Sequence, residues 1–102
     1  MVLLEFSITP LGGGEGVSQD VARAVDIIDR SGLDYQLHAM GTIVEGELDQ
    51  VLAVLKQCVE DLSQRHGRVT VAAKLDYRAG GKGRLQSKVD KVEQTLGRSL
   101  KK

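Results

Sequence analysis

The side chains of this sequence that could take part in chemistry are few and widely spaced. The two histidines, His38 and His66, have no Cys or Glu at the spacing of a metal site, so we expect no bound metal. The single cysteine, Cys58, excludes an internal disulfide and a cysteine metal cluster. It falls in an apolar helical pattern, which favours a buried side chain over a nucleophile. No Ser-His-Asp or Cys-His set is recognisable, so the residues predict no catalytic site and no enzyme.

Two further groups have both a chemical and a structural interpretation. Glu5 and Asp76 could form a carboxylate pair on neighbouring strands, but Glu5 could equally pair with Lys74 or Arg78, and cross-strand ion pairing is the favoured interpretation. The segment Gly80-Gly81-Lys82-Gly83-Arg84 superficially resembles a phosphate loop. It lacks the Walker spacing and the Ser or Thr that would hold magnesium, so we interpret it as a connection that could bind an anion only weakly.

The elements that must position these side chains follow from the periodicity of the apolar residues. Alternation predicts strands, and recurrence at helical spacing predicts helices, with Ser18 as an N-cap and Ser31-Gly32 as a stop for the first helix. Pro10 and the run 12–14 are expected to end the first strand. We expect strands over residues 2–9, 35–40, 42–45 and 68–78, and helices carrying the apolar residues of 21–28, 48–62 and 85–96.

This order predicts the fold class. A β-α-β-β-α-β series is the split β-α-β arrangement of ferredoxin-like α+β domains, in which two helices cover one face of a four-stranded antiparallel sheet. Here a C-terminal helix follows it. With 102 residues the chain is long enough for one domain and too short for two, so we expect a single domain over residues 1–102.

Strand alternation also predicts which face of the sheet the helices leave open. If the helices cover Leu4, Phe6 and Ile8, the open face carries mixed apolar and polar groups, a surface that suits self-association or a polar ligand. The third strand is undecided, because a bulge at Gly41 could place either Thr42 and Val44 or Ile43 and Glu45 on this face. The open face is expected to carry Leu3, Glu5, Ser7, Thr9, Gln36, His38, Met40, Thr70, Ala72, Lys74, Asp76 and Arg78.

The aromatic residues and the charge balance argue against several classes of partner. Phe6, Tyr35 and Tyr77 are the only aromatics and all fall on the covered side, so no ring is available to stack nucleic-acid bases. The net charge is zero, with seven basic and two acidic residues from Lys82 to Lys102. The N-terminal segment lacks the features of a signal peptide, and no apolar run approaches a membrane span. We therefore expect a cytoplasmic protein that binds neither nucleic acid nor membranes.

Particular residues add a resemblance to this pattern. The sequence resembles the small thiamine-binding protein family, related to hydroxymethylpyrimidine/thiamine-binding proteins of the YkoF type, over nearly its whole length. The Met-Gly-Thr and Glu-Gly segment is the most specific part. The residues that carry the resemblance are Glu5-Phe6-Ser7-Ile8, Pro10, Gly12, Ser31-Gly32-Leu33, Tyr35, Ala39-Met40-Gly41-Thr42, Glu45-Gly46, Arg68-Val69 and Asp76-Tyr77-Arg78.

The resemblance implies non-enzymatic binding of thiamine or its pyrimidine moiety, without a cofactor, by a homotetramer built as a dimer of dimers through the sheet faces. At matching positions it implies a ligand pocket formed by Ser7, Met40, Thr42 and Glu45. His38 departs from the pattern, because a less polar residue is expected there. The alternative is a structural or regulatory oligomerisation module that senses another small molecule.

Overall fold

The computed structural model describes residues 1–11, 17–80 and 83–101, which form four strands and three helices in the predicted order. The predicted strand end at 12–14 and Lys82 of the glycine-rich segment lie outside these residues. The elements are β1 (Val2–Pro10), α1 (Val17–Arg30), β2 (Asp34–His38), β3 (Gly41–Gly46), α2 (Leu48–Ser63), β4 (Val69–Tyr77) and α3 (Arg84–Leu96).

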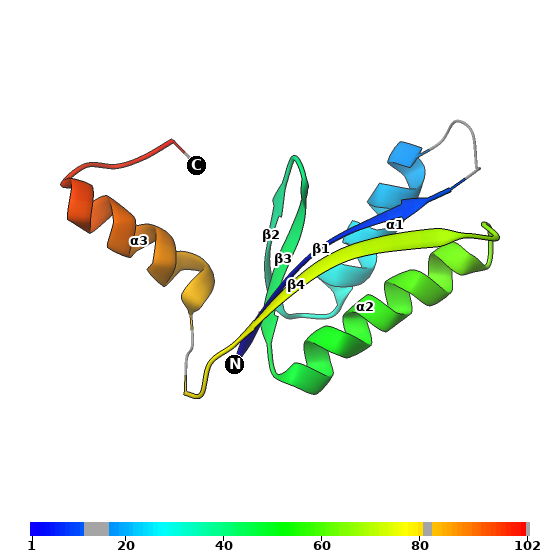
Figure 1. Ribbon diagram of the computed structural model, residues 1–102, viewed down its shortest axis with the longest axis horizontal. Helices are drawn as coiled ribbons and strands as arrows, with labels where there is room; N and C mark the ends of the chain where they lie inside the picture. The colour runs from blue at the N-terminus through cyan, green and yellow to red at the C-terminus, as the bar shows by residue number, and fades with distance from the viewer. Residues whose placement is uncertain (12–16, 81–82, 102) are drawn as a thin grey trace.

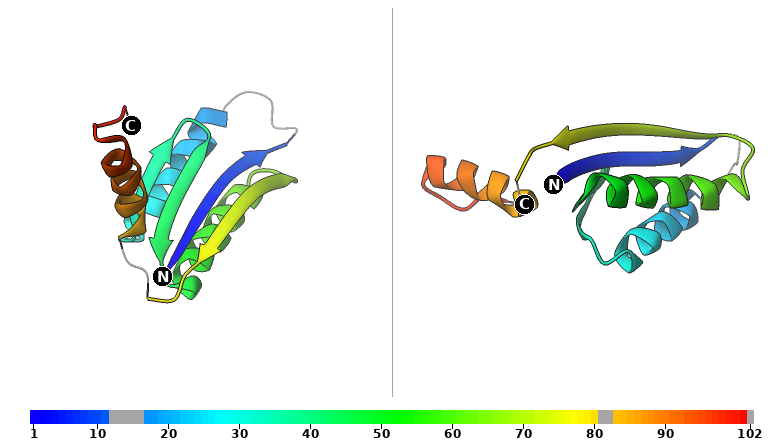
Figure 2. Two further views of the ribbon diagram at one scale, coloured as in Figure 1. Left: turned by 60° about the vertical axis from the view of Figure 1, so that its left-hand side comes forward. Right: turned by 90° about the horizontal axis from the view of Figure 1, so that it is seen from below.

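The sheet has the strand order β2-β3-β1-β4, and every neighbouring pair is antiparallel. Helices α1 and α2 lie together on one face, whereas α3 stands off one end of the sheet (Figures 1 and 2). The predicted α+β fold class, with a split β-α-β arrangement and an additional C-terminal helix, is confirmed. None of the described helices is long and apolar enough to cross a membrane.

The core lies between the sheet and the two helices. Alternate residues of β1 face it and are almost fully buried, as the period of two requires. The Cys58 thiol is also buried there, which raises its pKa to about 11, in agreement with the predicted structural role. The core consists of Val2, Leu4, Phe6, Ile8, Ala24, Ile28, Val44, Val51, Val54, Cys58 and Leu62.

The register settles the face of each strand. Leu4 pairs with Val44 and Phe6 with Thr42, so these β3 residues face the helices, and Ile43 and Glu45 lie on the open face. Tyr35 is opposite Val44 and Tyr77 is opposite Val2, which confirms that all three aromatics share the helix-facing side.

Two local predictions were wrong. The second strand ends at His38, and Ala39 and Met40 form a two-residue turn before Gly41 opens β3, so Met40 is not a strand residue. A two-residue connection is the commonest way to join antiparallel strands, and here it takes the place of the expected bulge. Helix α1 already includes Val17, so Ser18 lies within its first turn and is not its N-cap.

An ionic network joins α1 to the end of α2. The nearly buried Asp20 carboxylate accepts from the Arg65 guanidinium at 3.0 Å and lies 2.9 Å from His66 Nε2. Asp61 on α2 pairs with Arg23 on α1 at 2.7 Å. The hydrogen bond from Arg65, aided by His66, lowers the pKa of Asp20. His66, which follows the end of α2, therefore ties the two helices together.

Candidate functional site

A partly enclosed cavity lies where β1 and the β2–β3 hairpin separate. Pairing between β1 and β3 ends at Phe6 and Thr42, because β3 begins at Gly41. From Ser7 to Pro10, the register pairs β1 with β4 only. Helix α1 passes behind the resulting gap (Figure 2) and closes it from one side. The cavity measures about 210 Å³ and opens toward the hairpin tip.

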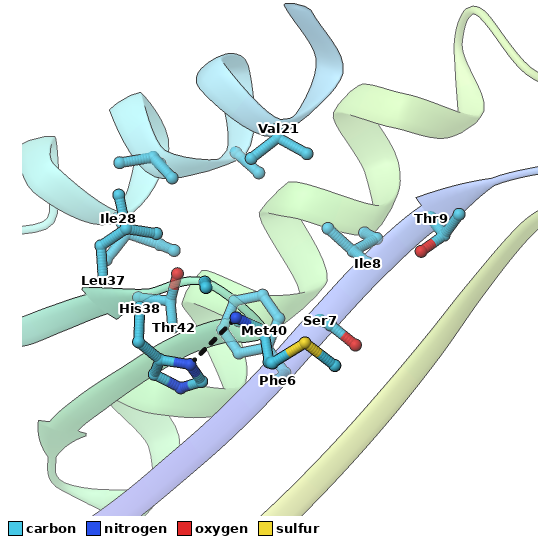
Figure 3. Close-up of a pocket in the computed structure, with 14 residues that line it drawn as sticks. Phe6, Ser7, Ile8, Thr9, Val21, Ile28, Leu37, His38, Met40 and Thr42 are labelled. Carbon is cyan, nitrogen blue, oxygen red and sulfur yellow. Dashed lines mark hydrogen bonds between the residues drawn. The ribbon is translucent and has the colours of Figure 1, made fainter. Parts of the chain in front are cut away.

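The cavity wall is mostly apolar. Val21, Ala24, Val25 and Ile28 come from one side of α1, because they recur at helical spacing. Figure 3 shows side chains of α1 facing the strands across the cavity, with Ser7, His38 and Met40 grouped below the centre of the view. The remaining lining residues are Phe6, Ile8, Thr9, Leu37, Ala39, Gly41 and Thr42. Such a wall suits an aromatic or heteroaromatic ring.

Thr42 brings a polar group to this apolar wall. The residue is only 5% exposed, and its hydroxyl makes no hydrogen bond with any residue that the structure describes. The buried side-chain atoms without a partner in the described chain are His38 Nε2 and two guanidinium nitrogens of Arg84, so the Thr42 hydroxyl keeps some contact with the space of the cavity and is open to a group that enters it. The hydroxyl can donate to a ring nitrogen or accept from an amine.

Gly41 allows the hairpin to approach β1 closely at the cavity. A Cβ atom at this position would lie 2.8 Å from the Phe6 carbonyl oxygen, closer than such contacts occur. A side chain here would push the hairpin away from β1 and change the width of the gap. The glycine therefore sets the dimensions of the cavity mouth.

His38 and Glu5 form a polar pair on the open face next to the same gap. His38 Nδ1 accepts the Met40 N–H at 3.2 Å, so in the neutral ring the proton is on Nε2. Nε2 lies 3.4 Å from the Glu5 carboxylate, without the geometry of a hydrogen bond. The sequence pattern predicted that Glu5 would form a cross-strand ion pair with Lys74 or Arg78. Lys74 is directly opposite in register, but the basic group that lies beside the Glu5 carboxylate in the described chain is the His38 ring, which forms an ion pair with it only when protonated.

A second hollow of about 220 Å³ lies on this open face. It shares Phe6, Ser7, His38 and Met40 with the cavity on the helix side, so both hollows lie beside the gap in the sheet. Its other walls are Glu5, Ala72, Ala73 and Lys74. The helix-side cavity is therefore mostly apolar with the hydroxyls of Ser7, Thr9 and Thr42, and the open-face hollow carries a carboxylate and an ammonium group.

Three of the four residues predicted for the pocket come together here. Ser7, Met40 and Thr42 all line the helix-side cavity, and Ser7 and Met40 also line the open-face hollow. Met40 is 82% exposed at the tip of the hairpin, beside the cavity mouth. Thr42 reaches the cavity from the helix-facing side of β3, so the site draws on both faces of the sheet.

Glu45 lies elsewhere. It is 3% exposed and accepts the Arg84 backbone N–H at 2.7 Å, which fastens the first turn of α3 to the sheet. The Arg84 guanidinium pairs with Asp76, whose pKa is lowered to about 2 by hydrogen bonds from Lys88 and Arg84. Glu45 does line a wider hollow of about 490 Å³ between β2 and α3. Its carboxylate is thus already used in holding α3.

Sequence reasoning missed the walls that α1 supplies. Val21 and Ile28 were recognised as an apolar helical face, but nothing in their spacing said which strands they would cross. His38 had given a signal, because its polarity departed from the expected pattern. In the described part of the chain, no group of three or more His, Cys, Asp or Glu side chains could hold a metal ion.

Comparison with known proteins agrees with this architecture. The sequence model of a protein family described as "thiamine-binding protein" matches residues 4–93 of this chain. A UPF0045 protein of Mycobacterium bovis is 42% identical over 96 residues, which cover 93% of this chain and 94% of that protein. A crystal structure of a hypothetical protein from Methanocaldococcus jannaschii is similar, with a TM-score of 0.82 and 31% identity over 91% of this chain and 96% of that one. A Thermotoga maritima protein provisionally assigned to thiamine biosynthesis or salvage has a TM-score of 0.78 and 26% identity, covering 89% of this chain and 97% of that one.

Proposed function

The chain belongs to the thiamine-binding protein family, and on that premise we propose that it is a cytoplasmic protein that binds thiamine or its hydroxymethylpyrimidine moiety and catalyses no reaction. The helix-side cavity is the proposed site. The observation that carries the proposal is the Thr42 hydroxyl, which has no hydrogen-bond partner in the described chain and borders a cavity whose wall on the α1 side is apolar. An aminopyrimidine ring has both donor and acceptor edges and would supply the missing hydrogen bond.

The size of the cavity supports a single ring. At about 210 Å³ it is smaller than the roughly 300–1,000 Å³ of pockets for drug-sized ligands. The pyrimidine ring would pack between α1 and Phe6, with Thr42 at its polar edge. Ser7 and Met40 would contact the ligand at the mouth, where a thioether makes favourable contacts with aromatic rings. Glu45 has no part in this proposed site, because it is engaged with α3.

Calorimetric titration of the purified protein with thiamine and with hydroxymethylpyrimidine tests the proposal. We expect micromolar affinity, about −8 kcal/mol, and a rise in melting temperature on addition of either compound. At a ligand concentration of 100 times Kd, the stabilisation should be about 2.7 kcal/mol. The absence of heat and of any melting shift with both compounds would refute the assignment.

We also propose that the chain assembles with copies of itself, as a homotetramer built from two dimers. Large apolar side chains are exposed on β4 and α3, among them Tyr77 at 66%, Val92 at 50% and Leu96 at 52%. Burying such residues against another copy would remove apolar area from water. Light scattering at micromolar concentration should return about four times the 11.0 kDa chain mass. A mass of one chain would contradict this assembly. If the assembly forms without any response to thiamine or hydroxymethylpyrimidine, the alternative of an oligomerisation module for another small molecule is favoured.

A further inference from the structure

We propose that His38 makes the tip of the β2–β3 hairpin sensitive to pH: the neutral ring holds the tip, and the protonated ring releases it and turns toward Glu5. This property belongs to the protein without a ligand and does not depend on the proposed function. The observation that carries it is one imidazole ring placed between two groups that compete for it. These are the Met40 N–H in the hairpin turn and the Glu5 carboxylate on β1.

The neutral ring stabilises the turn. Its Nδ1 accepts the Met40 N–H at 3.2 Å, the contact drawn as a dashed line in Figure 3. Ala39 and Met40 are both exposed, so the turn gains little from packing. In the described chain no other side chain forms a hydrogen bond with either residue. The hold on the tip therefore depends on an unprotonated Nδ1.

In this position the ring leaves its other nitrogen unsatisfied. Nε2 is buried and has no hydrogen-bond partner in the described chain, although the Glu5 carboxylate is only 3.4 Å away. A buried N–H without a partner is unfavourable. The His38 side chain as a whole is 33% exposed, so the ring has solvent on one side and is free to turn. The contact with Met40 is thus made at the expense of a better contact with Glu5.

Protonation reverses this preference. An imidazolium ring carries N–H groups on both nitrogens, so Nδ1 no longer accepts the Met40 N–H and the two N–H groups repel each other. The positive ring is at the same time attracted to the Glu5 carboxylate. Lys74 lies across from Glu5 and weakens this attraction, but it does not restore the acceptor at Nδ1. Glu5 and Lys74 are the only other charged side chains among the described residues lining the two hollows.

The movement of the tip changes access to the helix-side cavity. Met40 and Gly41 both line that cavity, and Thr42, which follows them, is 5% exposed while the tip is held. Release of the turn widens the cavity mouth and exposes Thr42 to solvent. Histidine is the side chain whose charge ordinarily changes between about pH 5 and pH 8, so the cavity opens on mild acidification.

The experiment is an NMR titration of the ligand-free protein from about pH 8 to about pH 5. The Met40 amide signal should follow the His38 ring signals with the same midpoint. Its exchange with solvent, corrected for the intrinsic effect of pH, should become about two- to tenfold faster, as expected for the loss of one neutral hydrogen bond. The Thr42 methyl signal should become more sensitive to a soluble paramagnetic probe. His66, which contacts Asp20, is an internal control whose titration should leave Met40 unchanged.

Two variants separate the partners of the ring. His38→Asn keeps an acceptor oxygen near the position of Nδ1 but does not titrate, so its Met40 amide should stay protected throughout. Glu5→Gln removes the carboxylate that attracts the cation, so the Met40 transition should move to lower pH. Glu60→Gln is the matched control on α2, because Glu60 is exposed and borders neither hollow, and it should leave the transition in place.

Three results would overturn the inference. The first is a wild-type Met40 amide that does not respond when His38 titrates. The second is a His38→Asn variant with the wild-type transition, which would assign the response to another group. The third is an unchanged transition in Glu5→Gln, which would show that Glu5 is not the second partner. None of these measurements involves a ligand, so the proposed function stands or falls separately.

Discussion

Replacing Thr42 with valine should stabilise the empty protein and weaken ligand binding at the same time. The substitution keeps the branched shape and exchanges the hydroxyl for a methyl group, at a residue that is 5% exposed and whose hydroxyl has no partner among the described residues. An unpaired hydroxyl that is fully buried costs about 1–3 kcal/mol, and this one, which keeps some contact with the cavity, costs no more than the lower end of that range. We therefore expect the free energy of unfolding to rise by about 1 kcal/mol. For a domain of this size, that is an increase in Tm of roughly 4–8 °C.

The same change removes one hydrogen bond to the ligand. A neutral hydrogen bond contributes about 0.5–1.5 kcal/mol, so the affinity for thiamine and for hydroxymethylpyrimidine should fall by roughly two- to tenfold. Urea or thermal unfolding of the ligand-free protein measures the first effect, and titration calorimetry measures the second. Thr70→Val is the matched control, because Thr70 is exposed on the open face and lines neither hollow. A less stable valine variant would show that the hydroxyl has a structural partner, and unchanged affinity would remove it from the site.

The remaining predictions concern backbone approach, pH and thiol reactivity. Gly41→Ala should destabilise the protein by about 1–3 kcal/mol, measured by urea unfolding, because the added methyl group meets the Phe6 carbonyl oxygen at 2.8 Å. It should also weaken ligand binding by changing the cavity mouth. The hydrogen bond from Arg65 holds the folded-state pKa of Asp20 below its ordinary value of 3.8, so its carboxylate stabilises the fold above that pH and loses this effect as pH falls through the folded-state pKa. Asp20→Asn should therefore melt at a lower temperature than wild type at pH 7, and the difference should shrink below pH 4. Cys58 should resist a thiol reagent at pH 8 until the protein unfolds, because burial raises its pKa to about 11.

Each of these has an outcome that would contradict it. An alanine at position 41 that leaves both stability and affinity unchanged would show that the hairpin can move without consequence. A stability difference for Asp20→Asn that persists undiminished at pH 3 would mean that the effect comes from packing and not from the charge. Reaction of Cys58 in the folded protein at the rate of a free thiol would show that the core opens readily.

The fold could be predicted from the sequence because the sequence patterns that indicate it are local and agree with one another. The alternation in β1 and β4 and the helical spacing in α1 and α2 fix which side of each element is apolar, and few arrangements bury all of those sides. Which residues of β3 face the helices could not be predicted, because this depends on whether Gly41 begins a strand or forms a bulge. The register decides it, with Thr42 opposite Phe6 and Ile43 on the other face.

The candidate site could be predicted only in part, for the same reason. Thr42 and Glu45 are close in sequence, and both were predicted to line one pocket. Three residues along a strand separate them by about 10 Å and place them on opposite faces. Glu45 consequently meets α3, while Thr42 meets α1. Ser7 and Thr42 also lie on opposite faces, yet they meet at one cavity, because the register ends and the sheet opens between them.

The break in pairing between β1 and β3 links the fold to the proposed function. A hairpin two residues longer would extend β3 along β1 past Phe6 and close the gap, at a gain in strand pairing. The short hairpin instead leaves part of β1 without a β3 partner and Thr42 without a hydrogen bond in the described chain, both beside the same cavity. Local departures of this kind from the rules that stabilise a fold are expected at binding sites. In this protein the part of β1 without a β3 partner and the Thr42 hydroxyl both border the helix-side cavity, so a ligand bound there would supply hydrogen bonds that the fold leaves unmade.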